Sequence, residues 1–231
     1  AAFSVGGDVA TRFQKGYEIG YFFGYQTAGI YQSQEEIDNA AVVQEGAKPG
    51  DLIFVDQDGD GVISFTDDSD KAYLGSAIPD FTMGFNLSGS YKGFDISANF
   101  YASIGNEIIR NYERQQPYAN QMSYVIDRWV GSESSFDVPR QTTEPTRNNV
   151  FSSFYVEDGS FLRLRNLQIG YAFSKDWLRK IKMEQLRVYV AANNLLTLTR
   201  YMGYDPDLGS TSALSAGVDY GLYPQAKTVM V

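Results

Sequence analysis

Two neighbouring stretches of the chain alternate apolar and polar residues with a period of two. Residues 81–91 read Phe-Thr-Met-Gly-Phe-Asn-Leu-Ser-Gly-Ser-Tyr, and residues 94–102 repeat the alternation after Lys92-Gly93. Successive side chains of a β-strand point to opposite faces, so this pattern indicates strands with one apolar and one polar face. A two-residue connection that contains glycine can join such strands directly. The sequence therefore predicts an antiparallel hairpin and an all-β fold.

The alternation returns in the second half of the chain. We expect three further strands, at residues 167–173, 185–193 and 227–231. Phe161 to Arg165 precede the first of these and lead into it. Residues 174–184 connect two of them and have the apolar spacing of a short helical turn. Residues 105–159 and 199–224, in contrast, are long polar segments, and unstructured connections of that length are uncommon in compact domains.

Two kinds of fold are consistent with these strands. In a soluble β-sandwich a second sheet would cover the apolar face, whereas in a transmembrane β-barrel lipid would cover it. Short connections at one end of the strands and long ones at the other are typical of an outer-membrane barrel. The 15 % share of aromatic residues also favours the barrel. On this interpretation 92–93 and 174–184 are periplasmic, and 105–159 and 199–224 are extracellular.

The composition excludes several classes of function. A net charge of −9 argues against a nucleic-acid partner, because phosphates require basic surfaces. The chain has no cysteine and no histidine, so disulfides, thiolate nucleophiles and the commonest zinc ligand and general base are absent. No pair of carboxylates is marked as a glycosidase pair. We therefore expect that the protein is not an enzyme.

One acidic loop has the residue spacing of a metal site. Residues 56–67 read Asp-Gln-Asp-Gly-Asp-Gly-Val-Ile-Ser-Phe-Thr-Asp. The candidate ligands follow positions 1, 3, 5, 7, 9 and 12 of an EF-hand calcium loop: Asp56, Asp58, Asp60, Val62, Ser64 and Asp67. Gly61 stands where such a loop turns sharply, and Ile63 would anchor the loop to a core. The sequence thus predicts a Ca²⁺ site, with an ion-free acidic turn as the alternative.

The segments beside this loop do not have the pattern of EF-hand helices. Residues 49–55 read as a short β-like run, and Gly75 and Pro79 follow the loop. Neither side has apolar residues at helical spacing. We therefore expect the loop to decorate a β-protein and to supply rigidity.

The chain resembles the TonB-dependent transporters of the SusC/RagA type over essentially its whole length. The resemblance depends on an ordered series of short segments: Gly20 to Tyr25, Gly29 to Ile37, Lys48 to Asp51, Asp56 to Ile63, Leu74 to Pro79, Phe85 to Asp95, Asp127 to Trp129, Pro139-Arg140, Val156 to Asn166, Arg187 to Val190, Asn193 to Thr197 and Gly203 to Asp207. Each segment alone is a weak signal, but their common order is specific.

This resemblance implies an antiparallel transmembrane β-barrel with long extracellular loops in the cell outer membrane. Residues 1–231 would be the C-terminal part, with about six strands of a barrel of about 22 strands. The plug domain and most strands would be missing, and the chain stops at Val231 without the family's final aromatic residue, so we expect a fragment.

The resemblance also implies a function and partners. The family imports glycans, oligosaccharides or peptides with a SusD-like surface lipoprotein and is driven by TonB, which would act through the missing N-terminal part. Further partners would be the rest of the barrel chain and outer-membrane lipid. The first alternative function is that of a soluble calcium-binding β-sandwich, such as a carbohydrate-binding or adhesin module. The second alternative is a secreted enzyme.

Five residues are candidates for substrate contact. Arg163 and Arg165 could line the lumen and meet substrate, or form a cross-strand charge ladder inside the barrel. Tyr201, Tyr204 and Asp205 could stack on and hydrogen-bond a sugar, or pack within their loop or against the lipoprotein.

Two tryptophans have plainer interpretations. Tyr118, Met122, Ile126 and Trp129 recur at helical spacing, which predicts a short amphipathic helix in which Trp129 belongs to a local loop core. Trp177 lies beside a short turn, where an aromatic anchor at the membrane interface is expected.

Overall fold

The computed structural model describes residues 2–5, 8–113, 120–210 and 212–231. The chain divides into two compact units. Unit 1 comprises Ala1–Ala77, Ile108–Glu157 and Leu208–Gly221, and unit 2 comprises Ile78–Glu107, Asp158–Asp207 and Leu222–Val231. In the described part of the chain, no helix is long and apolar enough to cross a membrane.

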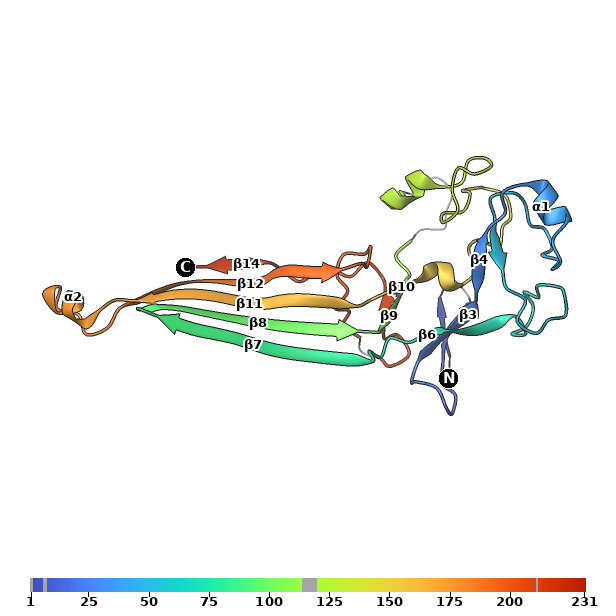
Figure 1. Cartoon of the computed structure of the whole chain (residues 1–231). Helices are drawn as coiled ribbons and strands as arrows, with labels where there is room; N and C mark the ends of the chain where they lie inside the picture. The colour runs from blue at the N-terminus through green and yellow to red at the C-terminus, as the bar shows by residue number, and fades with distance from the viewer. Residues whose placement is uncertain (1, 6–7, 114–119, 211) are drawn as a thin grey trace. The chain divides into compact units, whose positions relative to one another are not determined.

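Unit 2 is built on one antiparallel sheet of long strands, which lie side by side in Figure 1. The strand order is β14-β12-β11-β8-β7. The bounds of these strands are β7 Phe81–Tyr91, β8 Phe94–Ile104, β11 Phe161–Ala172, β12 Arg187–Thr199 and β14 Thr228–Met230. The hairpin predicted at 81–102 is therefore confirmed, as are the later strands.

Two of these strands are longer than the alternation predicted. The pairing of β11 with both neighbours shifts register between Leu164 and Asn166, so Arg165 is an extra residue opposite β8. Asn194, near the same point on β12, has a positive φ of 50°. Such β-bulges break the period of two but let the strands continue, which explains why the pattern underestimated their length.

The connection between β11 and β12 contains the helical turn that the sequence predicted. Helix α2 spans Lys175–Lys180 and buries Leu178. The N–H of Met183 donates to the carbonyl of Leu178 and that of Lys182 to Arg179, which closes the end of the helix. Figure 1 shows α2 at the end of the sheet where β7 and β8 also turn.

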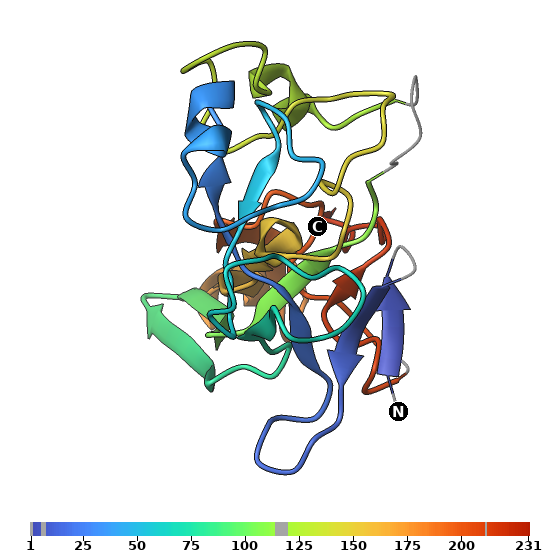
Figure 2. The ribbon, with the colours of Figure 1, turned by 90° about the vertical axis from the view of Figure 1, so that its right-hand side faces the viewer.

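Unit 1 contains a four-stranded sheet that the sequence did not predict. Its order is β1-β2-β3-β6, with bounds β1 Ala2–Val5, β2 Asp8–Arg12, β3 Tyr21–Tyr25 and β6 Lys71–Gly75. Ala10, Phe22, Ile109, Phe151 and Val218 form its core cluster. In Figure 2 the red segment that carries β13 lies beside the blue β2, and the Thr11 hydroxyl donates to the Leu214 carbonyl at 2.9 Å.

A second core cluster of unit 1 lies beneath the acidic loop. It consists of Tyr25, Ile30, Leu52, Phe54 and Ile63. The short strands that contribute to it are β4 Thr27–Ile30 and β5 Leu52–Phe54. The strand predicted within 49–55 is confirmed, although it covers only Leu52–Phe54, and the anchoring role of Ile63 is confirmed as well.

Trp129 packs against this second cluster, and its indole N–H donates to the Gln32 side chain at 3.1 Å. It therefore belongs to a packed core, although a wider one than the local loop core we expected. The predicted amphipathic helix is instead the 3₁₀ helix η1, Ser123–Asp127, in which Ile126 is 77 % exposed. Tyr118, the first residue of that prediction, lies outside the described residues.

The remaining elements are short. They are α1 Gln34–Asp38, β9 Glu107–Arg110, η2 Ser153–Tyr155, β10 Val156–Asp158 and β13 Val218–Asp219. Ser33 caps α1 by accepting a hydrogen bond from the N–H of Glu36. β9 and β13 pair in parallel, which joins two distant parts of the sequence within unit 1. In their described residues, the long polar segments thus contain short strands and 3₁₀ helices.

Candidate functional site

One face of the long sheet is apolar across all of its strands. Leu87 on β7 pairs with Ala98 on β8, which pairs with Leu167 on β11 and, through it, with Ala192 on β12. Similar rows run above and below this one. Large apolar side chains of these rows are well exposed, among them Phe85, Leu87, Ile96, Ile169, Val190 and Leu198. A face this large and apolar requires a cover of lipid or protein.

The opposite face carries a row of four asparagines and one threonine that crosses the whole sheet. Asn86, Asn99, Asn166, Asn193 and Thr228 occupy successive paired positions on β7, β8, β11, β12 and β14. The side chain of Asn99 donates to Asn86, Asn166 donates to Asn193 at 2.8 Å, and Asn193 donates to Thr228 at 3.2 Å. A ladder of hydrogen-bonded amides opposite an apolar face is the two-sided pattern of a barrel wall with a polar interior.

Arg163 is the most deeply buried charged residue of this polar face. Its side chain is 2 % exposed and forms an ion pair with Asp205. It also lies 3.3 Å from a carboxylate oxygen of Asp207 and donates at 3.0 Å to the Thr197 hydroxyl. Asp205 accepts a further hydrogen bond from the N–H of Gln225 at 3.0 Å. Arg163 therefore ties both ends of the 200–225 connection to the sheet.

The cross-strand charge ladder that we expected for Arg163 and Arg165 is wrong. The acidic partners of both arginines, Asp205 and Asp207, lie in the connection after β12 and not on a facing strand. Arg165 differs from Arg163 because it is the bulge residue, is 44 % exposed and stacks on the ring of Tyr101 at 3.9 Å.

The other candidate substrate residues are unequally exposed. Tyr201 is 6 % exposed and packs closely on Gly203, where an added Cβ would fall 2.4 Å from the tyrosine ring. Asp205 is 7 % exposed and is engaged by Arg163. Tyr204, in contrast, is 66 % exposed. Arg165 and Tyr204 are thus the candidates whose side chains a ligand can reach, and their contact with substrate stays a prediction.

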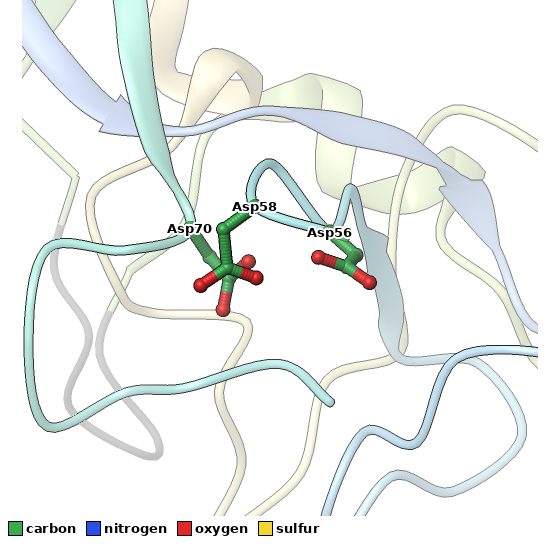
Figure 3. Close-up of side chains that lie close together, drawn as sticks. All are labelled: Asp56, Asp58 and Asp70. Atoms are coloured by element: carbon green, nitrogen blue, oxygen red, sulfur yellow. The ribbon is translucent and has the colours of Figure 1, made fainter. Parts of the chain in front are cut away.

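The acidic loop brings together two of the predicted ligands and one residue that the spacing missed. Carboxylate oxygens of Asp56, Asp58 and Asp70 all lie within 4.8 Å of one another. Figure 3 labels the three side chains. Asp70 is buried, and it accepts the N–H groups of Gln57 at 3.0 Å and Ser64 at 2.6 Å. It was missed because it stands three residues beyond Asp67, the twelfth position of the loop.

The other predicted ligands lie outside this group of three carboxylates. Asp60 accepts the N–H of Val62 at 2.8 Å, and Asp67 accepts both the N–H and the hydroxyl of Ser69. The Ser64 hydroxyl lies 3.2 Å from that of Thr66. Val62 is 46 % exposed and bridges in parallel to Val43.

Backbone amides and mutual repulsion shift the pKa values of Asp56 and Asp58 in opposite directions. The N–H of Gly61 is the main group that lowers the pKa of Asp56, with a second contribution from Gly59. For Asp58 the N–H of Asp60 lowers the pKa, but desolvation and repulsion from neighbouring aspartates outweigh it and raise the net pKa. Gly59 and Gly61 have φ of 77° and 85°, so glycine suits both turns.

The donor set of this loop fits a hard divalent cation. Ca²⁺ prefers carboxylate and carbonyl oxygens, and these three aspartates supply only oxygen. Each carboxylate oxygen has two lone pairs, so an oxygen that accepts a backbone N–H can also face an ion. A cation here would relieve the repulsion that raises the pKa of Asp58.

Comparisons with known proteins show that most of the chain is similar to TonB-dependent receptors. No family model matches the chain. TonB-dependent receptor P3 of Formosa agariphila is 38 % identical over 224 residues, and TonB-dependent receptor SusC of Bacteroides thetaiotaomicron is 27 % identical over 209 residues. These matches cover 93 % and 90 % of this chain but 22 % and 19 % of the relatives.

Solved structures of the RagAB peptide importer are also similar. In its open-open state the importer matches with a TM-score of 0.68 at 25 % identity, over 94 % of this chain and 22 % of that one. In the closed-closed state the TM-score is 0.65 at the same identity.

The two-faced sheet and these similarities define the class: the chain is part of the β-barrel of a TonB-dependent receptor. Within that class it is similar to the receptor SusC and to a chain of the RagAB importer. The relatives carry the names of receptors and importers and not of enzymes. It spans about a fifth of the length of the relatives it matches.

Proposed function

We propose that this chain forms a wall of an outer-membrane channel that imports nutrients in a TonB-dependent manner. The observation that carries the proposal is the sheet with its asparagine ladder on one face and exposed apolar rows on the other. Lipid would cover the apolar rows, and the ladder would face the lumen. In the described residues, unit 2 contains this sheet alone, so the unit holds no second sheet to cover the apolar face as a sandwich requires.

The lengths of the strands support this assignment. β7 and β8 have 11 residues each, and β11 and β12 have 12 and 13. At about 3.3 Å per residue an 11-residue strand reaches roughly 36 Å. Tilted by about 40°, it rises about 28 Å, which suffices for the apolar band of about 25 Å in outer-membrane barrels.

The partners follow from the same assignment. A SusD-like surface lipoprotein would cover the extracellular side, since relatives of this chain include SusC and the RagAB importer. The rest of the barrel would pair with the free edge of β7, because an unpaired strand edge cannot face lipid. TonB would act on the plug, and the cargo would be an oligosaccharide, a glycan or a peptide.

The acidic loop is proposed as a Ca²⁺ site that stiffens unit 1. Asp56, Asp58 and Asp70 would hold the ion through their carboxylates, as their mutual distances and the chemistry of the donor set support. Ile63 anchors the loop in the second core cluster, so an ion bound here would fix that part of the core. Such rigidity suits a surface on which a lipoprotein lid docks.

Whole-cell labelling tests the topology of the proposed channel. The chain lacks cysteine, so Tyr204→Cys and Lys180→Cys each introduce a single reactive thiol on an exposed residue. We expect a membrane-impermeant maleimide to label position 204 in intact cells, and position 180 only after the outer membrane is opened. Labelling of position 180 but not 204 in intact cells would reverse the topology. Recovery of the protein outside the outer-membrane fraction would overturn the proposal.

A further inference from the structure

A basic surface lies at the end of the long sheet where its strands turn. It is made by five residues from two connections: Lys92, Lys175, Arg179, Lys180 and Lys182. We call this set the turn-end surface. The N–H of Ala172, the last residue of β11, donates to the carbonyl of Gly93 at 2.8 Å, so the β7–β8 turn and the start of the α2 connection meet here.

Aromatic side chains border the turn-end surface on the side of the sheet. Phe94 packs on Tyr171 with ring centroids 4.6 Å apart, and Phe173 stacks on Trp177 at 4.9 Å. Trp177 and Ile181 are each 44 % exposed. An apolar sheet face, a belt of aromatic rings and then basic side chains is the order expected where a protein passes from acyl chains to lipid headgroups.

The basic residues of this surface are not neutralised by the protein. In the described part of the chain none of the five forms an ion pair, whereas neighbouring Arg187 is paired with Asp95. The acidic residues in the same connection are Asp176 and Glu184. An excess of positive charge here contrasts with the net charge of −9 for the whole chain.

Two of these lysines occupy backbone positions that favour other residues. Lys92 has a φ of 48° and Lys182 a φ of 57°, and only four described non-glycine residues have a positive φ. Lys92 begins a two-residue hairpin turn for which Asn-Gly is the preferred pair. Lys182 ends α2 at the position where glycine is usual. Lysine is thus present at both places despite its conformational cost, which points to a role for the charge.

We propose that the turn-end surface binds anionic phospholipid headgroups of the adjacent membrane leaflet. The lysines and Arg179 would pair with lipid phosphates, while Trp177 and Ile181 lie at the level of the glycerol backbone. Clusters of basic residues beside a membrane-spanning segment attract anionic lipids in this way. This inference rests on the proposed function, because it requires that the sheet spans a membrane.

Because Lys92 and Lys182 have a positive φ, both can be replaced by neutral residues that favour this backbone conformation, which removes charge and keeps the fold. Lys92→Asn with Lys182→Gly places the preferred residue at each left-handed position, so thermal stability should be unchanged or higher. The full-length protein in detergent is titrated with phosphatidylglycerol and, separately, with phosphatidylcholine, and bound lipid is measured by native mass spectrometry. We expect the double variant to bind phosphatidylglycerol roughly tenfold more weakly at low salt and phosphatidylcholine equally well.

The matched control is Lys15→Gln with Lys48→Gln, which removes two exposed lysines of unit 1. It should bind both lipids as the wild type does. Wild-type phosphatidylglycerol affinity in the turn-end variant, or an equal loss in the control, overturns the inference. If the turn-end variant loses import but keeps its lipid affinity, a periplasmic protein binds this surface, and the lipid inference is overturned. Failure of the wild type to fractionate with outer membranes overturns the proposed function instead.

Discussion

Arg163 on β11 forms a buried ion pair with Asp205, a residue 42 positions further along the chain in the connection after β12. The guanidinium is 2 % exposed, and the carboxylate is also bonded to the N–H groups of Asp207 and Gln225. One side chain of the sheet thereby fixes the path of the long connection where it leaves β12 and where it returns toward β14.

Loss of the Arg163 side chain should release this connection. Arg163→Ala leaves the carboxylate of Asp205 buried and unpaired, a change that typically costs about 3–5 kcal/mol. The strands themselves keep their pairing, so we expect faster proteolysis within 200–225 and a lower unfolding temperature. Limited proteolysis with mass-spectrometric mapping of the cut sites measures the effect.

Arg165→Ala is the control for this substitution. Its side chain is 44 % exposed, its contact with Asp207 is 3.4 Å long and it stacks on Tyr101, so the change should cost about 1 kcal/mol, well below the cost for Arg163→Ala. Equal protease sensitivity of the two variants would show that burial of Arg163 does not determine the order of the connection.

The order of the connection should also depend on pH. Burial alone would raise the pKa of Asp205, but the N–H groups of Gln225 and Asp207 and the guanidinium of Arg163 outweigh it and lower the pKa. The stabilisation from the charged carboxylate is therefore complete above the ordinary pKa of about 3.9 and is lost as the pH falls through the lowered folded value. Asp205→Asn should lack this acid transition in hydrogen exchange of residues 201–207.

Arginine substitutions distinguish the two faces of β7. Phe85 lies on the apolar face, stacked on Phe100 at 4.5 Å, and Asn86 belongs to the asparagine ladder. An arginine on the lipid face near the membrane midplane costs about 2–4 kcal/mol. We expect Phe85→Arg to reduce assembled protein in the outer membrane and Asn86→Arg to be tolerated. The reverse result would mean that the faces are inverted.

Metal binding should depend on Asp70 rather than on Asp67. Asp70→Asn removes one of the three gathered carboxylate charges, whereas the carboxylate of Asp67 is engaged with Ser69. Isothermal titration with Ca²⁺ should show at least a tenfold weaker affinity for Asp70→Asn and an affinity near wild type for Asp67→Asn. If Asp67→Asn loses more calcium affinity than Asp70→Asn, the ligands are those of the twelve-residue spacing and the group with Asp70 is wrong.

Calcium affinity should fall in mild acid. The pKa of Asp58 is raised, so this carboxylate takes up a proton at a higher pH than an ordinary aspartate and then competes with the ion. The calcium titration, repeated at decreasing pH, should show this weaker affinity first. Protonation of Asp56 should weaken binding only at still lower pH, because the pKa of Asp56 is lowered. If the calcium affinity does not change as the pH is lowered, Asp58 is not a ligand.

The sequence predicted the long strands because their alternation is a local property. Residues 81–91 have a period of two over almost their whole length, and Gly93 allows the tight turn that joins them to β8. The ends of β11 and β12 were less predictable, since the bulges at Arg165 and Asn194 shift the pattern to the other phase.

The sheet of unit 1 could not be predicted from alternation. β3 reads Tyr-Phe-Phe-Gly-Tyr and is buried on both faces apart from Phe23, so its sequence is apolar throughout. Such a run does not by itself distinguish a strand from a buried helix.

The sequence did not predict all residues of the candidate sites, because some of them lie far apart along the chain. Asp56 and Asp58 follow a known spacing, but Asp70 joins them only because the chain bends at residues 65–70 before β6 begins. The partner of Arg163 was equally hidden, because no local pattern relates a strand arginine to an aspartate 42 residues away. Both contacts are products of the tertiary fold.

The most direct test of the membrane assignment is the environment of adjacent β7 positions in the assembled protein. Single cysteines at Phe85, Asn86 and Leu87 are spin-labelled in the full-length protein reconstituted in lipid, and collision with oxygen is compared with collision with a water-soluble nickel complex. Labels at 85 and 87 should be accessible to oxygen and protected from nickel, and the label at 86 should show the reverse. Equal nickel access at all three positions would contradict a lipid-facing wall.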